Sequence, residues 1–301
     1  MIIPEGQVIR MSYAKYPKEM KEAVIARMLQ GDETIMDIQR DTGIGINTLY
    51  RWRAELKKKQ VYDILLMPIQ CTKHCGFNDK RNVEIKKQEN IIETTQTYWP
   101  EYKDRNTGKA FRYAFKPDCD MSDFACGFYE IIYKDFLDGK NVVDNNGCLV
   151  DKDYAGDTMT SVSQLPGLKN RYHCLANFWI LPVELGRKSK HQLAKTSGCY
   201  NIKDFMDRFL LLLKYKLEDY KKNFPNYFYK VDRFEEISDI HLLCDSYLDK
   251  QYNILQYSDV INEQTEEYLW DCIKKRAETI SNSGFGPELW KYFEKNNIFE
   301  T

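Results

Sequence analysis

The sequence lacks any long apolar run. No window of its 301 residues approaches the roughly eighteen uninterrupted apolar residues that a membrane-spanning helix requires. The first residues also lack the basic region, apolar stretch and small-residue cleavage site that mark a secretory signal. These absences predict a protein that does not associate with membranes and that stays in the cytoplasm.

Several patterns of enzyme chemistry are missing as well. The chain has no glycine-rich loop that would cradle a nucleoside triphosphate or a dinucleotide, and no pair of acidic motifs in a setting typical of a two-metal site. Cys71, His74 and Cys75 form the strongest metal-like pattern, but no second cysteine pair follows at the distance usual for zinc. We therefore expect no cofactor, no bound metal and no catalytic residue.

The composition that remains is typical of a folded protein with an uneven charge distribution. Charged residues make up 30% of the chain and apolar residues 43%. The formal net charge is −1, yet residues 1–60 carry eleven Lys and Arg against eight Asp and Glu, a local charge of +3 that leaves −4 for the rest. Because chains of this length commonly form more than one domain, we expect a small basic domain followed by a larger one.

Three helical segments are predicted near the N-terminus. The segment 17–29 opens with a proline, which suits the first turn of a helix, and Gly31 stops it. The segment 34–42 is shorter and begins with a threonine suited to the N-cap. A tight turn over residues 43–45 precedes a third helix that begins near Asn47. Helix, short helix, turn and helix is the order of a helix-turn-helix.

The third helix is predicted to have two different sides. Leu49 and Trp52 lie three residues apart, so they face the same way and can pack against Ile38 and Ile44. The other side is predicted to be exposed. It consists of Ile46, Asn47, Thr48, Tyr50, Arg51 and Arg53.

The exposed residue types match the chemistry of DNA recognition. Asparagine pairs with adenine, arginine pairs with guanine, threonine contacts the methyl group of thymine, and tyrosine can hold a phosphate oxygen. A run of three lysines further along the helix would meet the phosphate backbone. The predicted DNA-binding residues are Asn47, Thr48, Tyr50, Arg51, Arg53, Lys57, Lys58 and Lys59.

Taken together, the segments Lys15–Leu29, Thr42–Ile44 and Thr48–Arg53 resemble the small helix-turn-helix subunit of insertion-sequence transposases. The resemblance covers about residues 12–59. In that family this subunit recognises the terminal inverted repeats of the element, and a separate catalytic subunit performs strand transfer. The resemblance therefore implies a bacterial protein that binds double-stranded DNA sequence-specifically and has no strand-transfer chemistry of its own.

The expected fold class is mainly α. A three-helix helix-turn-helix module over residues 1–60 precedes a larger, mostly helical α+β domain. Residues 61–95 are expected to form a connection and the start of this second domain. Residues 96–301 are expected to form a mainly helical domain of unknown function, with a small β component near 98–150.

The second domain is expected to be built largely from amphipathic helices. Apolar stripes at helical spacing predict helices over about 202–220, 234–249 and 260–280, and a short helix follows near the C-terminus. Such a domain would supply the surface for a homodimer or for a partner protein. A dimer would bind two half-sites spaced by about one turn of the duplex.

The segment Tyr172–Pro182 supports a different hypothesis. It loosely resembles the element of some His-Me-finger nucleases in which leucine, a small residue and asparagine precede an apolar run. In this alternative His173 is the general base, Asn177 orients it and Asp157 binds the metal. The stretch 155–160 lacks the histidine that such nucleases place there. The alternative function is a metal-dependent nuclease or defence-type effector that the N-terminal module directs to DNA.

Overall fold

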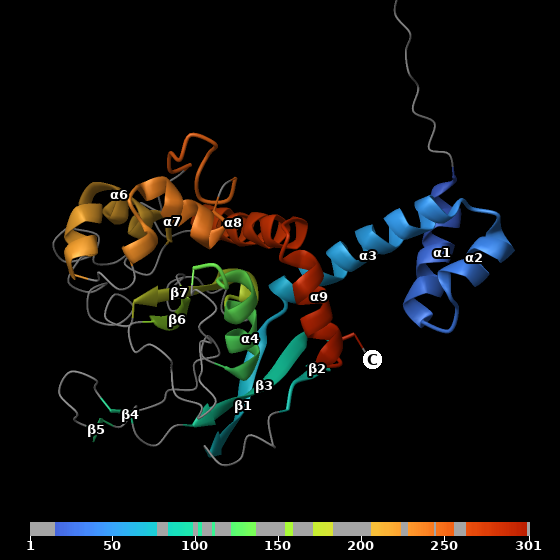
Figure 1. Ribbon diagram of the computed structural model, residues 1–301, viewed down its shortest axis with the longest axis horizontal. Helices are drawn as coiled ribbons and strands as arrows, with labels where there is room; N and C mark the ends of the chain where they lie inside the picture. The colour runs from blue at the N-terminus through green and yellow to red at the C-terminus, as the bar shows by residue number, and fades with distance from the viewer. Residues whose placement is uncertain are drawn as a thin grey trace, which may run out of the picture. The chain divides into compact units, whose positions relative to one another are not determined.

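The computed structural model describes residues 16–76, 84–98, 102–103, 110–111, 122–136, 154–158, 171–182, 206–223, 228–243, 245–255 and 263–299. The chain divides into two compact units, Met1–Lys57 and Lys58–Thr301. Helices predominate and the sheets are small, which confirms the mainly α fold class (Figure 1). No helix in the described part of the chain is both long enough and apolar enough to cross a bilayer.

The helices of the first unit begin and end where the sequence provides caps. They are α1 (Lys18–Gln30), α2 (Ile35–Thr42) and the first part of α3 (Ile46–Leu66). Pro17 stands at the N-cap of α1, and Thr34 forms a capping box with Asp37 at the start of α2. Gly31 and Gly43 close α1 and α2 in the left-handed conformation, with φ of 76° and 67°.

Five apolar side chains form the core of the first unit. They are Val24, Ile38, Ile44, Leu49 and Trp52, each at most 4% exposed. The rings of Tyr16 and Trp52 meet at 5.6 Å with an interplanar angle of 82°. The predicted packing of Leu49 and Trp52 with Ile38 and Ile44 is confirmed, and with it the three-helix arrangement of a helix-turn-helix.

The third helix is longer than the segment predicted to read DNA. α3 continues to Leu66, and its C-terminal part supplies Val61, Ile64 and Leu65 to the core of the second unit. The division between the units falls after Lys57, so the lysine run of α3 contributes residues to both.

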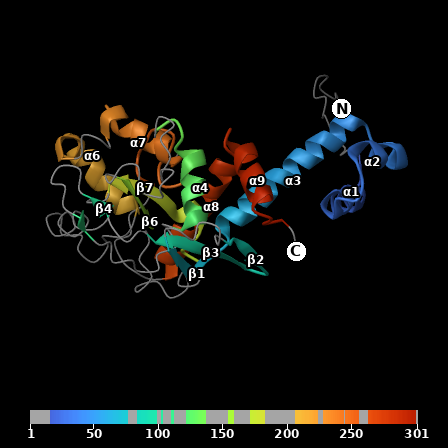
Figure 2. The same ribbon diagram turned by 60° about the horizontal axis from the view of Figure 1, so that its bottom comes forward.

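Strands in the second unit form small sheets. Figure 2 shows the largest sheet described, with strand order β1-β3-β2. β1 pairs with β3 in parallel, and β2 pairs with β3 antiparallel. The bounds are β1 (Ile69–Gly76), β2 (Lys86–Gln88) and β3 (Ile91–Tyr98). Two antiparallel pairs are β4 (Tyr102–Lys103) with β5 (Ala110–Phe111), and β6 (Tyr154–Thr158) with β7 (Phe178–Pro182).

The three-stranded sheet lies earlier in the chain than the expected β component. We expected a connection and the start of the second domain over 61–95 and a small β component near 98–150, and this sheet lies within residues 69–98. The described strands between residues 99 and 150 are β4 and β5, of two residues each. β3 is rich in β-branched residues, which favour a strand, but it lacks the regular alternation of apolar and polar residues; the adjacent Thr94 and Thr95 are both buried.

Helices make up most of the described second unit. They are α4 (Asp123–Ile132), α6 (Met206–Asn223), α7 (Phe234–His241), α8 (Glu263–Asn282), α9 (Gly286–Lys295) and the 3₁₀ helices η4 (Leu175–Asn177) and η7 (Phe228–Lys230). The three predicted amphipathic helices correspond to α6, α7 and α8. α7 ends earlier than expected because Leu242 adopts a left-handed conformation with φ of 57°. α4 contacts both β3 and α9.

Arg276 of α8 joins several elements of this core. Its fully buried guanidinium donates from Nε to the carbonyl oxygen of His241 at 2.9 Å. Nη1 donates to the carbonyl oxygens of Ala176 and Phe178 at 2.7 and 2.9 Å. The guanidinium carbon also lies 3.8 Å from the centroid of the Trp179 ring. One side chain therefore connects α8 with α7, η4 and β7.

Candidate nucleic-acid interface

The polar side of α3 is open to solvent in the first unit. Asn47, Arg51 and Arg53 are exposed and Thr48 is half-buried. Tyr50 is 52% exposed, which is unusual for a tyrosine next to the buried Leu49. The predicted DNA-binding side chains near the start of α3 therefore lie outside the core of this unit.

The turn before α3 presents the N-terminus of that helix in a fixed conformation. The backbone N–H of Gly43 donates to the carbonyl oxygen of Gln39 at 2.9 Å, which closes α2. The hydroxyl of Thr42 accepts from the N–H of Ile44 at 3.3 Å and donates to the carbonyl oxygen of Ile38 at 2.6 Å. The first turn of α3 contains no acidic residue, so the positive end of its helix dipole is not neutralised there.

The acidic residues of the first unit lie mainly on its other elements. Arg27 of α1 donates to both carboxylate oxygens of Glu33, at 2.6 and 2.5 Å, and to Asp41 at 2.5 Å. The hydrogen bonds from Arg27 to Glu33 lower the pKa of Glu33. Between Ile46 and Lys59, Glu55 is the single acidic residue of α3. Positive charge is therefore concentrated on α3, although the described unit as a whole is close to neutral.

Glu55 lies between two cations of different helices. Its Oε2 accepts a hydrogen bond from Nζ of Lys21 on α1 at 2.8 Å. Its Oε1 is 3.9 Å from Nε of Arg51, one helical turn earlier on α3. The spacing of Arg51 and Glu55 along one helix is visible in the sequence. The contribution of Lys21 is not, because it depends on how α1 packs against α3.

The lysine run differs from residue to residue. Lys58 is exposed and Lys57 is half-buried. Nζ of Lys59 makes an ion pair with Asp63 at 2.6 Å, one turn further along α3. A phosphate would therefore have to replace Asp63 as the partner of Lys59, whereas Lys58 can meet a phosphate from its exposed position.

The residues of the nuclease alternative lie in the second unit. Asp157 stands on β6 opposite Trp179 of β7. His173 is partly buried, and its ring centroid is 3.8 Å from that of Tyr172. Asn177 is fully buried and donates from Nδ2 to the carbonyl oxygen of Tyr172 at 3.0 Å. This alternative stays a prediction.

Ligand sets for a metal do not assemble in the described residues. No group of three His, Cys, Asp or Glu side chains there has the proximity that a metal ion requires. The metal-like segment that begins at Cys71 belongs to strand β1. Its His74 and Cys75 side chains lie outside the described part, so the zinc pattern stays a sequence-level observation.

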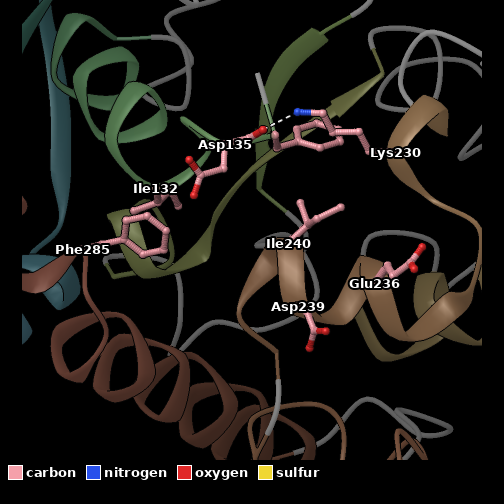
Figure 3. Close-up of a pocket in the computed structure, with 8 residues that line it drawn as sticks. Ile132, Asp135, Lys230, Glu236, Asp239, Ile240 and Phe285 are labelled. Carbon is pink, nitrogen blue, oxygen red and sulfur yellow. Dashed lines mark hydrogen bonds between the residues drawn. The ribbon is translucent and has the colours of Figure 1, made fainter. Parts of the chain in front are cut away.

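A cavity of about 430 Å³ opens in the second unit (Figure 3). It is lined by Ile132, Asp135, Phe136, Lys230, Glu236, Asp239, Ile240 and Phe285. Nζ of Lys230 donates to the backbone carbonyl oxygen of Asp135. Three carboxylates against one ammonium give this lining a negative charge, which disfavours an anionic ligand such as a phosphate backbone.

Comparison with known proteins gives a match that lies at the N-terminal end of the chain. Residues 11–64 match a family model of the transposase helix-turn-helix, described as Transposase. No curated protein and no solved structure matches the chain. The match covers α1 and α2 completely and nearly all of α3, and it leaves most of the second unit outside. The N-terminal part of the chain is thus similar to the transposase helix-turn-helix, and this similarity suggests DNA binding at this end.

Proposed function

We propose that this protein binds double-stranded DNA sequence-specifically, with α3 as the recognition helix in the major groove. The observation that carries the proposal is the division of α3 into two sides. Leu49 and Trp52 are at most 4% exposed in the core, whereas Asn47, Tyr50 and Arg51 are exposed. A helix fixed along one side and polar along the other is what entry into a major groove requires.

The side chains of α3 take different roles in this proposal. Arg51 pairs with guanine and Asn47 with adenine, since each can make two hydrogen bonds to a base edge. Thr48, Tyr50 and Arg53 contact neighbouring base edges or sugar–phosphate groups. The phosphate backbone is contacted by Lys57, Lys58 and Lys59.

The second unit has a supporting role in this proposal. It holds the protein in a homodimer or attaches it to a partner protein, and strand transfer is left to a separate catalytic subunit, as in the transposases that the first unit resembles. A dimer would read two half-sites separated by about one turn of DNA. The negatively charged cavity of this unit is compatible with a role other than DNA contact.

The test begins by selecting duplexes from a random library with the full chain. Arg51→Ala is expected to weaken binding to the selected duplex by about 5- to 160-fold, because a bidentate arginine–guanine pair contributes about 1–3 kcal/mol. Lys18→Ala is the matched control, since Lys18 is an exposed cation on α1 whose partner is Glu22 at 3.6 Å. Both variants are expected to melt at nearly the temperature of the native protein, because both side chains are exposed.

Two outcomes would reject the proposal. One is the absence of any enriched sequence in the selection, which would leave no specific site. The other is an Arg51→Ala variant that binds the selected duplex as tightly as Lys18→Ala does, which would remove Arg51 from the reading side.

A further inference from the structure

One carboxylate on α3 faces two cations from different directions. Oε2 of Glu55 accepts from Nζ of Lys21 at 2.8 Å, while Oε1 faces Nε of Arg51 at 3.9 Å. The first distance is that of a charge-assisted hydrogen bond, and the second is too long for one. Lys21 therefore holds the Glu55 carboxylate in place, and the carboxylate attracts Arg51 without a hydrogen bond.

The stability of the module does not account for this arrangement. The side chains of Lys21, Glu55 and Arg51 are 40%, 48% and 67% exposed. Ion pairs between groups so exposed contribute little to stability, because water and salt screen them. The negative charge of Glu55 would weaken DNA binding, because it lies on the side of α3 that would face DNA. Stability of the unit does not explain why a carboxylate stands there.

The geometry at Arg51 supplies part of that explanation. The carboxylate lies on the Nε edge of the guanidinium, which leaves the two Nη groups available at the far end. Those two groups are the ones that reach O6 and N7 of guanine in an end-on bidentate pair. A carboxylate fixed behind Arg51 would therefore orient the guanidinium for a base edge.

The negative charge of Glu55 also affects how the helix binds DNA of any sequence. Phosphate oxygens offer a cation an acceptor at every step of the duplex, whatever the sequence. Glu55 repels phosphates and partly neutralises Lys21 and Arg51, so it weakens binding to any duplex through the backbone alone. An element that penalises the wrong partner raises the ratio between specific and non-specific affinity.

The geometry points to Glu55 as a specificity-determining residue of the recognition helix. It positions Arg51 toward a guanine edge, with Lys21 as its support, and it suppresses sequence-independent binding. This inference rests on the proposed function. It adds a residue that makes no favourable contact with DNA of its own, and it assigns Lys21 of α1 a role in base recognition.

The test uses the full chain, the duplex selected with it, and a scrambled duplex of the same length and composition. Glu55→Gln removes the charge with little change in shape, and Glu55→Asp keeps the charge but shortens the reach. Glu22→Gln is the matched control, because Glu22 is an exposed acidic residue paired with Lys18 on α1. Dissociation constants are measured for both duplexes over a series of salt concentrations.

The three variants are expected to differ in their binding to the scrambled duplex and in their ratio of specific to non-specific affinity. Glu55→Gln should bind the scrambled duplex about threefold or more tightly, and its ratio of specific to non-specific affinity should fall about tenfold. Glu55→Asp should leave binding to the scrambled duplex nearly unchanged while the ratio still falls severalfold. Glu22→Gln should keep the native ratio.

A purely structural role for Glu55 would weaken binding to both duplexes by the same factor and would overturn the inference. So would a Glu55→Gln variant that matches Glu22→Gln in every measurement. Both results presuppose that the native protein prefers its selected duplex, so they leave the proposed function intact. Failure of the native protein to show that preference would instead reject the proposed function.

Discussion

His241 is a histidine that cannot easily carry a proton. Its side chain is 2% exposed, and Nδ1 lies 2.8 Å from the hydroxyl of Tyr133. The guanidinium of Arg276 is close by and donates to the backbone carbonyl oxygen of His241 at 2.9 Å. Burial, and secondarily the positive charge of Arg276, lower the pKa of His241 to about 3. The folded protein therefore keeps this ring neutral at pH values where an unfolded chain would protonate it.

This difference predicts a loss of stability in mild acid. The ring of His241 titrates near pH 6.5 in the unfolded chain. Its contribution to the free energy of unfolding is therefore fully present above that pH and is lost as the pH falls from about 6.5 toward 3. The loss from this one group amounts to about 2 kcal/mol at pH 5. Denaturant unfolding of the full chain at pH 7, 6 and 5 measures it. His241→Gln, which cannot titrate, should lose less stability over the same range.

Tyr133→Phe separates titration from hydrogen bonding in this experiment. The variant loses the hydroxyl that contacts His241 but retains the buried histidine. It should be less stable at every pH while keeping the native dependence on pH. If His241→Gln shows the same loss between pH 7 and pH 5 as the native protein, another group is responsible.

The packing of α4 against α9 depends on a glycine. A Cβ added to Gly127 would lie 2.4 Å from the ring of Tyr292 on α9. That ring cannot move away freely, because its hydroxyl donates to the carbonyl oxygen of Phe124 at 3.1 Å and its plane stacks on Phe124. The Tyr292 ring therefore lies closer to the backbone of α4 than a side chain at position 127 would allow.

Gly127→Ala tests this contact, because the contact determines whether the replacement raises or lowers the free energy of unfolding. In an unconstrained helix the replacement would stabilise by about 1 kcal/mol, because alanine is the better helix former. In α4 we expect destabilisation of about 1–3 kcal/mol from the overlap with Tyr292. The measurement is denaturant unfolding of the full chain. In a Tyr292→Leu background, where the ring is absent, the same replacement should become neutral or stabilising.

A stabilising effect of Gly127→Ala in the native background would mean that the Tyr292 ring can move away from position 127 without loss of stability. Equal effects in both backgrounds would show that Tyr292 is not the residue that restricts this position.

For the whole molecule, the parts that the sequence predicted are those determined by local interactions. The first unit could be recognised because its glycines, its capping threonine and the spacing of Leu49 and Trp52 act within a few residues of one another. The polar side of α3 follows from the same spacing. Lys21 could not be recognised as part of the site, because its contact with Glu55 joins residues that are 34 positions apart.

The second unit was less predictable for physical reasons. Its main sheet joins β1 and β3 in parallel, a pairing between segments that are not adjacent in the chain. α4 was missed, although its buried residues follow helical spacing from Phe124 to Ile132; the segment is short and contains Gly127, which weakens a helix signal. Arg276 is fully buried and bonded to neutral groups, a role that no sequence pattern for arginine indicates.

The charge of the whole molecule makes a final prediction about DNA binding. A chain with a formal net charge of −1 has no general attraction for DNA, so we expect its affinity to come from the basic side of α3. Few phosphates are then neutralised, and the logarithm of the binding constant should fall with the logarithm of salt concentration with a slope of about −2 to −4.

Lys58→Ala should make this slope less negative by about one, because it removes one phosphate contact. Lys250→Ala, at an exposed lysine of the second unit, is the control and should leave the slope unchanged. A slope far steeper than expected, or an equal change from Lys250→Ala, would place phosphate contacts outside α3, because each neutralised phosphate adds to the slope wherever it is bound.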